Sequence, residues 1–246
     1  MRIAVTGAAG TIGRQIVNEL SGLHELRLID RHRVPGHRTI CADLGRGPSR
    51  WGLGPRRPSW ERAFEQADVV VHLAANASAQ AGWDGVLKDN IVASFRVLEA
   101  AARHGVPRVV FASSCRWVLG LDPETRPDWS RLRISPASEP RPRTLYGLSK
   151  TWGETVGRMF VDTGRLRSFL AVRIGSFSEL EPSDPERRRL WVCPRDLRSL
   201  LRRCVEAPVD GFHVVYAVSH AAAGPFDLSM ARNLLGWQPM QPADPS

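Results

Sequence analysis

Short apolar runs alternate with amphipathic stretches along the whole chain. Strand-like apolar runs predict strands at residues 2–6, 26–29, 39–42, 69–75, 108–113, 167–174 and 211–217. Apolar positions at helical spacing predict helices at residues 11–20, 60–66, 86–104, 146–163 and 195–206. Strands that alternate with helices predict an α/β fold, a doubly wound parallel sheet of the Rossmann type covered on both faces.

The length and the order of these elements predict one domain. A chain of 246 residues is an ordinary size for a single α/β domain. We expect residues 1–175 to form a dinucleotide-binding core and residues 176–246 a small substrate-binding portion, much of which completes the sheet. Residues 44–58, dense in Gly, Pro and Arg, predict a surface insertion, and residues 120–143 predict a loop.

The positive charge of the chain narrows the class of partner. The formal net charge is +9, yet Lys88 and Lys150 are the only lysines and the arginines are spread along the chain. Spread arginine does not form the basic patch typical of nucleic-acid binding, so we expect no nucleic-acid partner. An anionic small-molecule substrate fits the charge at least as well.

The composition favours neither a metal site, nor a disulfide framework, nor a membrane protein. Cys41, Cys115, Cys193 and Cys204 are scattered and form no CxxC pair, so we expect no bound metal and no disulfide framework. No apolar run is long enough to cross a bilayer. The first predicted strand follows Met1 without an apolar leader, which favours a cytoplasmic location.

A glycine-rich loop, TGAAGTIG, occupies residues 6–13 between the first predicted strand and the first predicted helix. Gly7 permits a tight turn, Gly10 lets the backbone approach a pyrophosphate, and Gly13 lets the helix pack closely on the sheet. The amino terminus of the helix then presents its N–H groups and its dipole to the anion. A glycine-rich structural turn is the alternative, but a strand before the loop and a helix after it favour dinucleotide binding.

The end of the second predicted strand bears on the choice of dinucleotide. Asp30 can accept hydrogen bonds from both adenosine ribose hydroxyls and would repel a 2′-phosphate, which favours NAD over NADP. Arg31 and Arg33 argue mildly for NADP, because either guanidinium could pair with that phosphate. Asp43 and Leu44 follow the third strand and can flank the adenine, whereas a simple turn role is the alternative for Asp43.

Tyr146 and Lys150 stand four residues apart in the sequence LYGLSKTWGE. This spacing puts both side chains on one helix face, where they can point into one cleft. An adjacent ammonium and an oxidised nicotinamide both favour the phenolate, so we expect a lowered pKa for the tyrosine. The phenolate could then take a proton from a substrate hydroxyl. An ordinary helix face is the alternative, since such pairs also occur by chance.

The segment FASSCRW, residues 111–117, leaves the end of a predicted parallel strand. Ser113, Ser114 and Cys115 are therefore expected at the edge of the sheet where ligands bind. A hydroxyl there could orient the reacting oxygen toward Tyr146. Simple capping of the strand end is the alternative.

Together, TGAAGTIG, HLAA, FASS, YGLSK with a following GE, and VRIGS resemble the extended short-chain dehydrogenases, or NAD-dependent epimerase/dehydratase family. The resemblance covers nearly the whole chain except residues 44–58 and 120–140. Within that family, YGLSKTWGE, LAVRIGSF and the stretch from residue 191 onward are most similar to the uronate dehydrogenases. The resemblance implies a Rossmann fold and NAD-dependent oxidation of a sugar acid at its anomeric carbon, which yields a lactone.

The resemblance also implies a role for each matching residue. Tyr146 is implied as the base with Lys150 as its partner, together with Ser114 or Cys115 at the reacting oxygen. Cofactor contacts are implied at Gly7, Gly10, Thr11, Ile12, Gly13, Asp30, Arg31, Asp43, Leu44, Leu73, Ala74, Ala75, Asn90, Tyr146, Lys150 and Ile174. Substrate contacts are implied at Ser78, Ser114, Ser176 and one arginine among Arg187, Arg188 and Arg189. Cys115 and Arg116 are further candidate substrate contacts, and Arg116 could recruit a second anionic group.

That arginine would pair with the uronate carboxylate, a contact for which the guanidinium fork is well shaped. A solvated run of charge is the alternative for residues 187–189. The pattern departs from the uronate dehydrogenases at Cys115 and Arg116, where they carry Asn and His, and at Thr11, where they carry a polar amide. The thiol of Cys115 is a weak hydrogen-bond donor. Either Ser114 therefore donates to the reacting oxygen in place of Cys115, or the reaction differs.

Three other functions remain open from the sequence. A nucleotide-sugar epimerase or dehydratase shares the loop and the Tyr/Lys pair, although only about seventy residues follow Ile174 to hold a large substrate. A dehydrogenase for another ring alcohol fits the departures at Cys115 and Arg116. A regulatory protein that senses dinucleotides is disfavoured by the retained Tyr146 and Lys150. Helices 86–104 and 146–163 could pair with a second copy of the chain.

Overall fold

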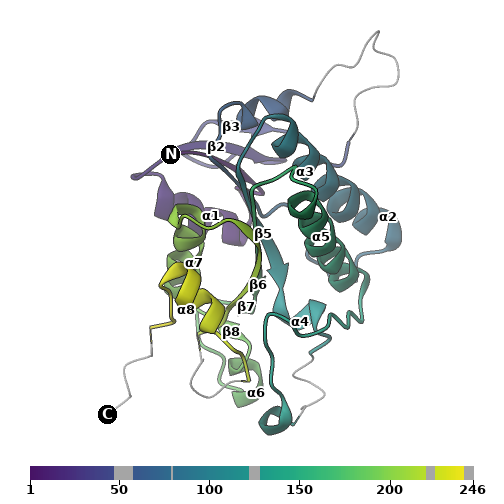
Figure 1. Cartoon of the computed structure of the whole chain (residues 1–246), viewed down its shortest axis with the longest axis vertical. Coiled ribbons are helices and arrows are strands. Elements are labelled where there is room, and N and C mark those ends of the chain that lie inside the picture. The colour runs from purple at the N-terminus through teal and green to yellow at the C-terminus, as the bar shows by residue number, and fades with distance from the viewer. Residues whose placement is uncertain (47–57, 79, 122–127, 220–224, 241–246) are drawn as a thin grey trace.

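The computed structural model describes residues 1–46, 58–78, 80–121, 128–219 and 225–240 (Figure 1). Its described residues form a seven-stranded parallel sheet in the order β3-β2-β1-β4-β5-β6-β9. The strands are β1 (Arg2–Thr6), β2 (Glu25–Asp30), β3 (Thr39–Cys41), β4 (Val69–His72), β5 (Arg108–Ser114), β6 (Ser168–Ile174) and β9 (Gly211–Ala217). The predicted doubly wound Rossmann-type sheet is confirmed, and each strand overlaps a predicted one.

Helices cover both faces of this sheet (Figure 1). One face carries α1 (Thr11–Leu20), α7 (Pro194–Glu206) and α8 (Ser229–Leu235). The other carries the 3-10 helix η1 (Ser59–Phe64), α3 (Ala93–Arg103) and α5 (Leu145–Asp162). Alternate residues of each strand supply the two cores: Ile3 and Val5 of β1 face one side, and Ala4 faces the other.

The helix predicted at 86–104 begins earlier and is not uniform. It starts as α2 (Trp83–Val86), continues as the π-helical segment η2 (Leu87–Val92) and ends as α3. The π-helical segment carries Asn90, which is buried. Wider turns of this kind are common near functional sites, because they re-aim the side chains they carry.

Helix α5 packs closely on the sheet because two of its residues, Gly153 and Gly157, lack side chains. A Cβ atom at Gly153 would lie 2.3 Å from the ring of Phe111, and one at Gly157 would lie 2.4 Å from the ring of Phe169. Those two rings belong to β5 and β6 and have centroids 5.7 Å apart. The close approach packs the middle of α5 directly against β5 and β6.

Beyond the main sheet, short elements that the periodicity did not predict cover its carboxyl end. They are α4 (Cys115–Val118), η4 (Trp129–Arg131), β7 (Ser176–Phe177), α6 (Pro185–Arg188) and β8 (Trp191–Val192). Helix α8 was also missed. Elements of two to seven residues offer too few positions to establish a period. The predicted loop at 120–143 is interrupted by η4 and by a bridge between Ile134 and Phe226.

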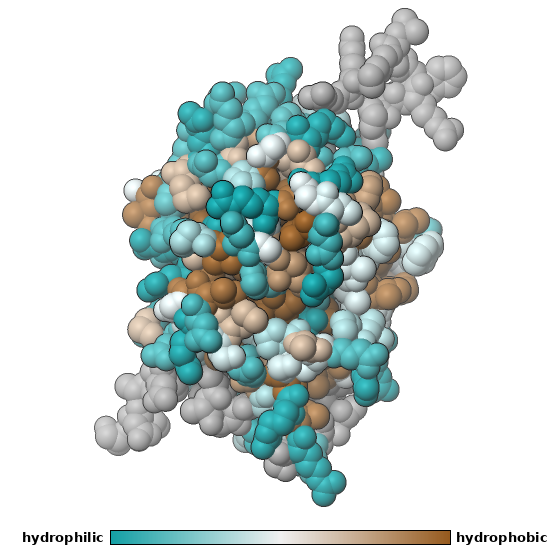
Figure 2. All heavy atoms as spheres, in the orientation of Figure 1, coloured by the Kyte–Doolittle hydropathy of each residue, from teal (hydrophilic) through white to brown (hydrophobic). Residues whose placement is uncertain are grey.

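The polarity of the surface varies across the face shown in Figure 2. In the face shown in Figure 2, hydrophobic residues gather in the middle and hydrophilic residues border them. Most of the predicted insertion at 44–58, namely residues 47–57, lies outside the described residues. In the described part of the chain, no helix is both long and apolar enough to span a membrane.

Candidate active site

Two adjoining cavities open at the carboxyl ends of the central strands and share Gly7, Gly10, Leu73 and Ala75. The β2-side cavity, about 160 Å³, is lined by Gly7, Gly10, Ile29, Asp30, Arg31, Ala42, Leu44, Gly45, Leu73, Ala74, Ala75, Asp89 and Ala93. The β5-side cavity, about 470 Å³, is lined by Gly7, Gly10, Thr11, Ile12, Gly13, Leu73, Ala75, Ala77, Ala112, Ser113, Ser114, Trp117, Tyr146, Lys150, Ile174, Gly175 and Phe177. Together they form one cleft at the edge where doubly wound sheets bind ligands.

The turn between β1 and α1 forms the floor of this cleft. Gly7 has φ +71°, and a Cβ there would lie 2.5 Å from the backbone nitrogen of Ala74. A Cβ at Gly13 would lie 2.1 Å from the carbonyl oxygen of Gly7. Gly10 caps α1 without a side-chain hydrogen bond, so the first turn directs backbone N–H groups toward the cleft. This cradle fits the pyrophosphate of a dinucleotide.

Asp30 lies at the end of β2, in the wall of the β2-side cavity. Its Oδ2 accepts a hydrogen bond from the backbone nitrogen of Ala9 at 3.0 Å, and its Oδ1 accepts one from that of His32 at 2.9 Å. These two bonds tie the carboxylate to the phosphate loop and fix its direction. The position suits a carboxylate that accepts hydrogen bonds from a ribose.

Of the two predicted adenine contacts, Asp43 and Leu44, only Leu44 lines the β2-side cavity. Leu44 lines the β2-side cavity and is buried. Asp43 instead accepts a hydrogen bond from the backbone nitrogen of Gly45 at 3.0 Å and pairs with Arg31 and Lys88. Its carboxylate therefore contributes to the charge at the rim of the cavity, and it is not among the residues that line the cavity.

Tyr146 and Lys150 meet in the β5-side cavity, on the first two turns of α5. Thr144 caps this helix by accepting a hydrogen bond from the backbone nitrogen of Gly147 at 3.0 Å. The Nζ of Lys150 lies 5.5 Å from the centre of the Tyr146 ring and 5.0 Å from that of Phe111. The helical spacing therefore brings the phenol and the ammonium to one wall of the cleft.

Burial dominates the titration of both side chains. It raises the pKa of Tyr146 to about 12 and lowers the pKa of Lys150 to about 8, while the nearby Glu154 carboxylate opposes the second shift. The lowered pKa expected for Tyr146 in the presence of an oxidised nicotinamide stays a prediction, and in the chain without cofactor burial disfavours the phenolate.

A buried polar network lies behind this pair, and only part of it was suggested by the sequence. Glu154, one turn after Lys150, accepts hydrogen bonds from the Nε and Nη2 of Arg173 at 3.0 and 2.8 Å. Ser113 donates to the same carboxylate at 2.5 Å. Arg173 also donates to the Tyr216 hydroxyl at 3.0 Å. The available signal was an arginine inside a fully buried strand, which requires a partner.

Asn90 was predicted to contact the cofactor, but the structure places it behind the cleft. Its Oδ1 accepts from the backbone nitrogen of Asn76 at 2.7 Å, and its Nδ2 donates to the carbonyl of Asn76 at 3.1 Å. The same amide donates to Ser149 at 2.9 Å. Asn90 thus ties the segment after β4, which lines both cavities, to helix α5.

Among the predicted substrate residues, Ser114 lines the β5-side cavity and Cys115 does not. The Cys115 side chain is fully buried in the core below α1 and α7, and burial raises the pKa of its thiol to about 12. The strand turns into α4 at this residue, which directs the side chain into the core. The prediction of Cys115 as a residue of the cavity is therefore corrected.

The other predicted substrate residues lie around the cavity. Arg116 stacks over the ring of Trp117 at 4.4 Å, and Trp117 lines the β5-side cavity. Ser176 lies between the lining residues Gly175 and Phe177. Ser78 is exposed and its hydroxyl hydrogen-bonds within its own turn, to Gln80.

The arginine cluster at 187–189 lies on and beside α6, and the structure does not bring it to the lining of either described cavity. Arg187, Arg188 and Arg189 lie within 4 Å of carboxylates of the same segment, those of Asp184, Glu181 and Glu186 respectively. In the described residues, no group of three or more His, Cys, Asp or Glu side chains is arranged to hold a metal ion.

Comparisons with known proteins agree with this geometry. A profile of the NAD dependent epimerase/dehydratase family matches residues 3–187. The chain is 30% identical to an NAD-dependent glucose-6-phosphate dehydrogenase of Haloferax volcanii, over 96% of this chain and 92% of that protein. It is 34% identical to a uronate dehydrogenase of Agrobacterium fabrum, over 99% of this chain and 86% of that protein.

Solved structures extend the comparison to a bound cofactor. A mutant of the uronate dehydrogenase from Agrobacterium tumefaciens, crystallised with NAD, is similar with a TM-score of 0.78 and 31% identity. The alignment covers 98% of this chain and 84% of that one. The predicted family resemblance, the enzyme class and NAD as cofactor are confirmed.

Proposed function

We propose that this chain, which belongs to the NAD-dependent epimerase/dehydratase family, is a dehydrogenase that oxidises a ring hydroxyl of an anionic sugar. A uronate-like sugar acid is the first candidate substrate. One observation carries the proposal: the phosphate loop and the Tyr146–Lys150 pair open into the same cleft. A loop that holds a dinucleotide and a proton acceptor beside it are the two requirements for hydride transfer from an alcohol.

In this proposal NAD supplies the hydride acceptor, and its oxidised nicotinamide adds a positive charge to the cavity. That charge and the Lys150 ammonium both favour the Tyr146 phenolate, against the burial that raises the pKa of Tyr146 to about 12. Tyr146 takes the proton of the substrate hydroxyl as the carbon is oxidised. Lys150, in the same wall of the cleft, stabilises the phenolate that accepts this proton.

Ser114 is the hydroxyl that we assign to the reacting oxygen. Ser113 and Ser114 both line the cavity, but the hydroxyl of Ser113 donates to Glu154. Ser114 follows at the last position of β5 and lines the same cavity. A hydroxyl donor there orients the substrate oxygen toward Tyr146 and replaces the weaker thiol of the buried Cys115.

The anionic character of the substrate rests on two observations. The chain carries a formal net charge of +9. Both curated relatives described above are named for sugars with a negative group, a phosphate in one and a carboxylate in the other. Arg116, beside Trp117 at the cavity, is the cation that we assign to the recognition of that group.

The test is a reduction assay with purified protein and NAD. Glucuronate, galacturonate, glucose 6-phosphate and the matching neutral hexoses are supplied in turn, and absorbance of the reduced nicotinamide is followed. Reduction with an anionic sugar and at most slow reduction with its neutral counterpart would support the proposal. A protein that binds NAD but reduces it with none of these sugars would refute it.

The second candidate is a redox-neutral epimerase or dehydratase of the same family. It shares the loop and the Tyr146–Lys150 pair. Each sugar is therefore also analysed after incubation, because an epimerase or dehydratase would convert the sugar without net reduction of NAD. A dehydratase needs a further acid and base, and none of the described residues that line the β5-side cavity carries a carboxyl or imidazole group. This composition favours the dehydrogenase.

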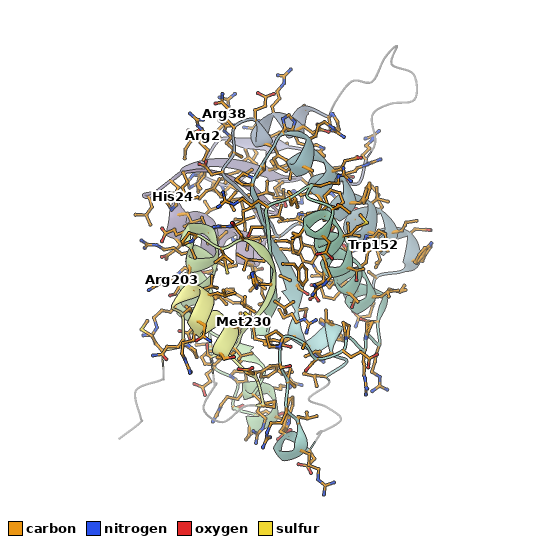
Figure 3. All side chains as sticks on the ribbon, viewed as in Figure 1. Arg2, His24, Arg38, Trp152, Arg203 and Met230 are labelled. Atoms are coloured by element: carbon orange, nitrogen blue, oxygen red, sulfur yellow. The ribbon has the colours of Figure 1, made fainter. Side chains whose placement is uncertain are left out.

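Self-association is a further part of the proposal. Trp83 on α2 and Leu148, Trp152 and Met159 on α5 are large apolar side chains that remain exposed. Trp152 lies on the outer side of α5, away from the sheet (Figure 3). Such a set favours contact with a second copy of the chain, as expected for helices 86–104 and 146–163. Sedimentation of the wild type and of Trp152→Ser would test it.

A further inference from the structure

Arg31 is held by two carboxylates at the rim of the β2-side cavity. Its Nη1 donates to Oδ2 of Asp89 at 3.1 Å, and its Nη2 also contacts the other oxygen of that carboxylate. Nη2 further donates to Oδ1 of Asp43 at 3.1 Å. A guanidinium that binds one carboxylate through two nitrogens is fixed in direction as well as neutralised.

The contacts of Arg31 and Asp43 favour the charged forms of both side chains. The hydrogen bond to Asp89 is the main reason that the pKa of Arg31 lies above its ordinary value. Burial raises the pKa of Asp43, but hydrogen bonds from Lys88 and Arg31 outweigh it and bring the value down to about 2. Lys88 lies 2.6 Å from the second oxygen of Asp43. The carboxylates of Asp89 and Asp43 are only 15% and 23% exposed, against 46% for Arg31.

Two members of this cluster face the ligand side. Arg31 and Asp89 both line the cavity, together with Asp30, the carboxylate suited to the ribose. Asp30 and Asp89 therefore bring two negative charges to the wall, and Arg31, the cation of that wall, is already engaged by Asp89. Asp89 reaches this position from the π-helical segment η2, far from Arg31 in sequence.

We propose that Asp89, acting through Arg31, sets the preference of this enzyme for NAD over NADP. To bind a ribose 2′-phosphate, Arg31 would need N–H groups that are free to donate hydrogen bonds to it. In this structure its Nη1 and Nη2 already donate to the carboxylate of Asp89. Asp89 also repels the phosphate directly. It is a positioning residue, because its main effect passes through the guanidinium. The inference rests on dinucleotide binding in the cleft and not on the identity of the sugar.

The test compares dinucleotide affinities of Asp89→Asn with those of the wild type, by calorimetry with NAD and with NADP and without any sugar. The amide keeps the size of the side chain but leaves Arg31 able to turn toward a phosphate. We expect NADP to bind about tenfold more tightly than to the wild type and NAD to change by less than about threefold. Asp84→Asn is the matched control, because it removes one exposed carboxylate from the neighbouring turn of the same helical region.

The double variant Asp89→Asn/Arg31→Ala separates the two possible routes. Loss of the gain in NADP affinity in this variant supports action through Arg31. The proposal is overturned if NADP affinity rises no more in Asp89→Asn than in Asp84→Asn, or if the gain survives without Arg31. It is also overturned if the wild type binds NADP as well as NAD. Asp89→Ser, judged by the same criteria, replaces Asp89→Asn if that protein does not fold.

This experiment also distinguishes failure of the inference from failure of the proposed function. A wild type that binds neither dinucleotide contradicts both. A wild type that binds NAD but oxidises none of the sugars contradicts only the proposed substrate, and the affinities of the Asp89 variants still decide the role of that residue.

Discussion

Arg173 donates two hydrogen bonds to the carboxylate of Glu154, at 3.0 and 2.8 Å, and both side chains are almost completely buried. The pair joins β6 to α5 beneath the cleft. Glu154 also accepts the hydroxyl of Ser113 and opposes the lowering of the pKa of Lys150. The charge that supports the proposed base is therefore balanced by a carboxylate that is itself held by the core of the sheet.

Removal of this carboxylate should be costly for the fold. In Glu154→Ala, the guanidinium of Arg173 stays buried without its charged partner, so we expect a loss of about 3–5 kcal/mol in the free energy of unfolding. Urea denaturation measures it. Glu99→Ala removes a carboxylate that is 40% exposed and pairs with Arg103, and should cost less than about 1 kcal/mol. Equal losses in the two variants would contradict the assigned importance of the buried pair.

The two tyrosines of the chain provide a matched test of the proposed base. Tyr146→Phe keeps the ring but removes the proton acceptor, so kcat should fall by about 10²- to 10⁴-fold while NAD affinity changes little. Tyr216→Phe removes a hydroxyl that donates to the carbonyl of Ser135 at 2.7 Å, outside the described cavity lining. The same hydroxyl accepts a hydrogen bond from Arg173 at 3.0 Å, so the variant should cost about 1–3 kcal/mol of stability and leave kcat within about threefold. Similar kcat values for both variants would remove Tyr146 from the mechanism.

The close packing of α5 on the sheet predicts that Gly157 cannot be replaced by a larger residue without a loss of stability. In Gly157→Ala, the new methyl group would meet the Phe169 ring at 2.4 Å, so either the helix or the ring must move. We expect a loss of about 1–3 kcal/mol in the free energy of unfolding. Gly85→Ala is the control, since that helical Cβ meets only Asn76 at 3.5 Å and should stabilise by about 0.5–1 kcal/mol. A stable Gly157→Ala protein would show that α5 can shift without cost.

His72 predicts a specific sensitivity to acid. Burial, with a smaller effect of Lys150, lowers the pKa of His72 to about 3, where its ring hydrogen-bonds Thr6 at 2.7 Å and Ser94 at 3.0 Å. The unfolded chain takes up this proton near pH 6.5, so it binds one proton more than the folded chain between these values. The contribution to stability is present above pH 6.5 and is lost at about 1.4 kcal/mol per unit as the pH falls toward 3.

Urea denaturation across this range tests the effect by comparison with His72→Gln, which has no titrating ring. From pH 6.5 to about 5, the wild type should lose about 2 kcal/mol more than the variant. The absolute stability of the variant at pH 7 does not enter the comparison. Parallel curves for the two proteins would mean that His72 is protonated in the folded state or does not titrate in the unfolded one.

Several features of this protein follow from neighbours along the chain, and the sequence by itself determined them. The strand–loop–helix unit around Gly7, Gly10 and Gly13 depends on local turn geometry and on a helix start. The Tyr146–Lys150 face depends on the helical repeat. Both are short-range properties, so apolar periodicity and spacing were sufficient to predict them. The parallel sheet followed from the alternation of strands and helices.

Only the tertiary structure decided which distant side chains meet. Arg31 and Asp89 are 58 residues apart, and Ser113 and Glu154 are 41 residues apart. No local pattern relates such residues, because their contact depends on strand order and helix packing. The same holds for Cys115, which the turn into α4 buries, and for the arginines of 187–189, which pair within their own segment. The physical reason is that sequence spacing determines the face of an element on which a residue lies, whereas packing determines what that face meets.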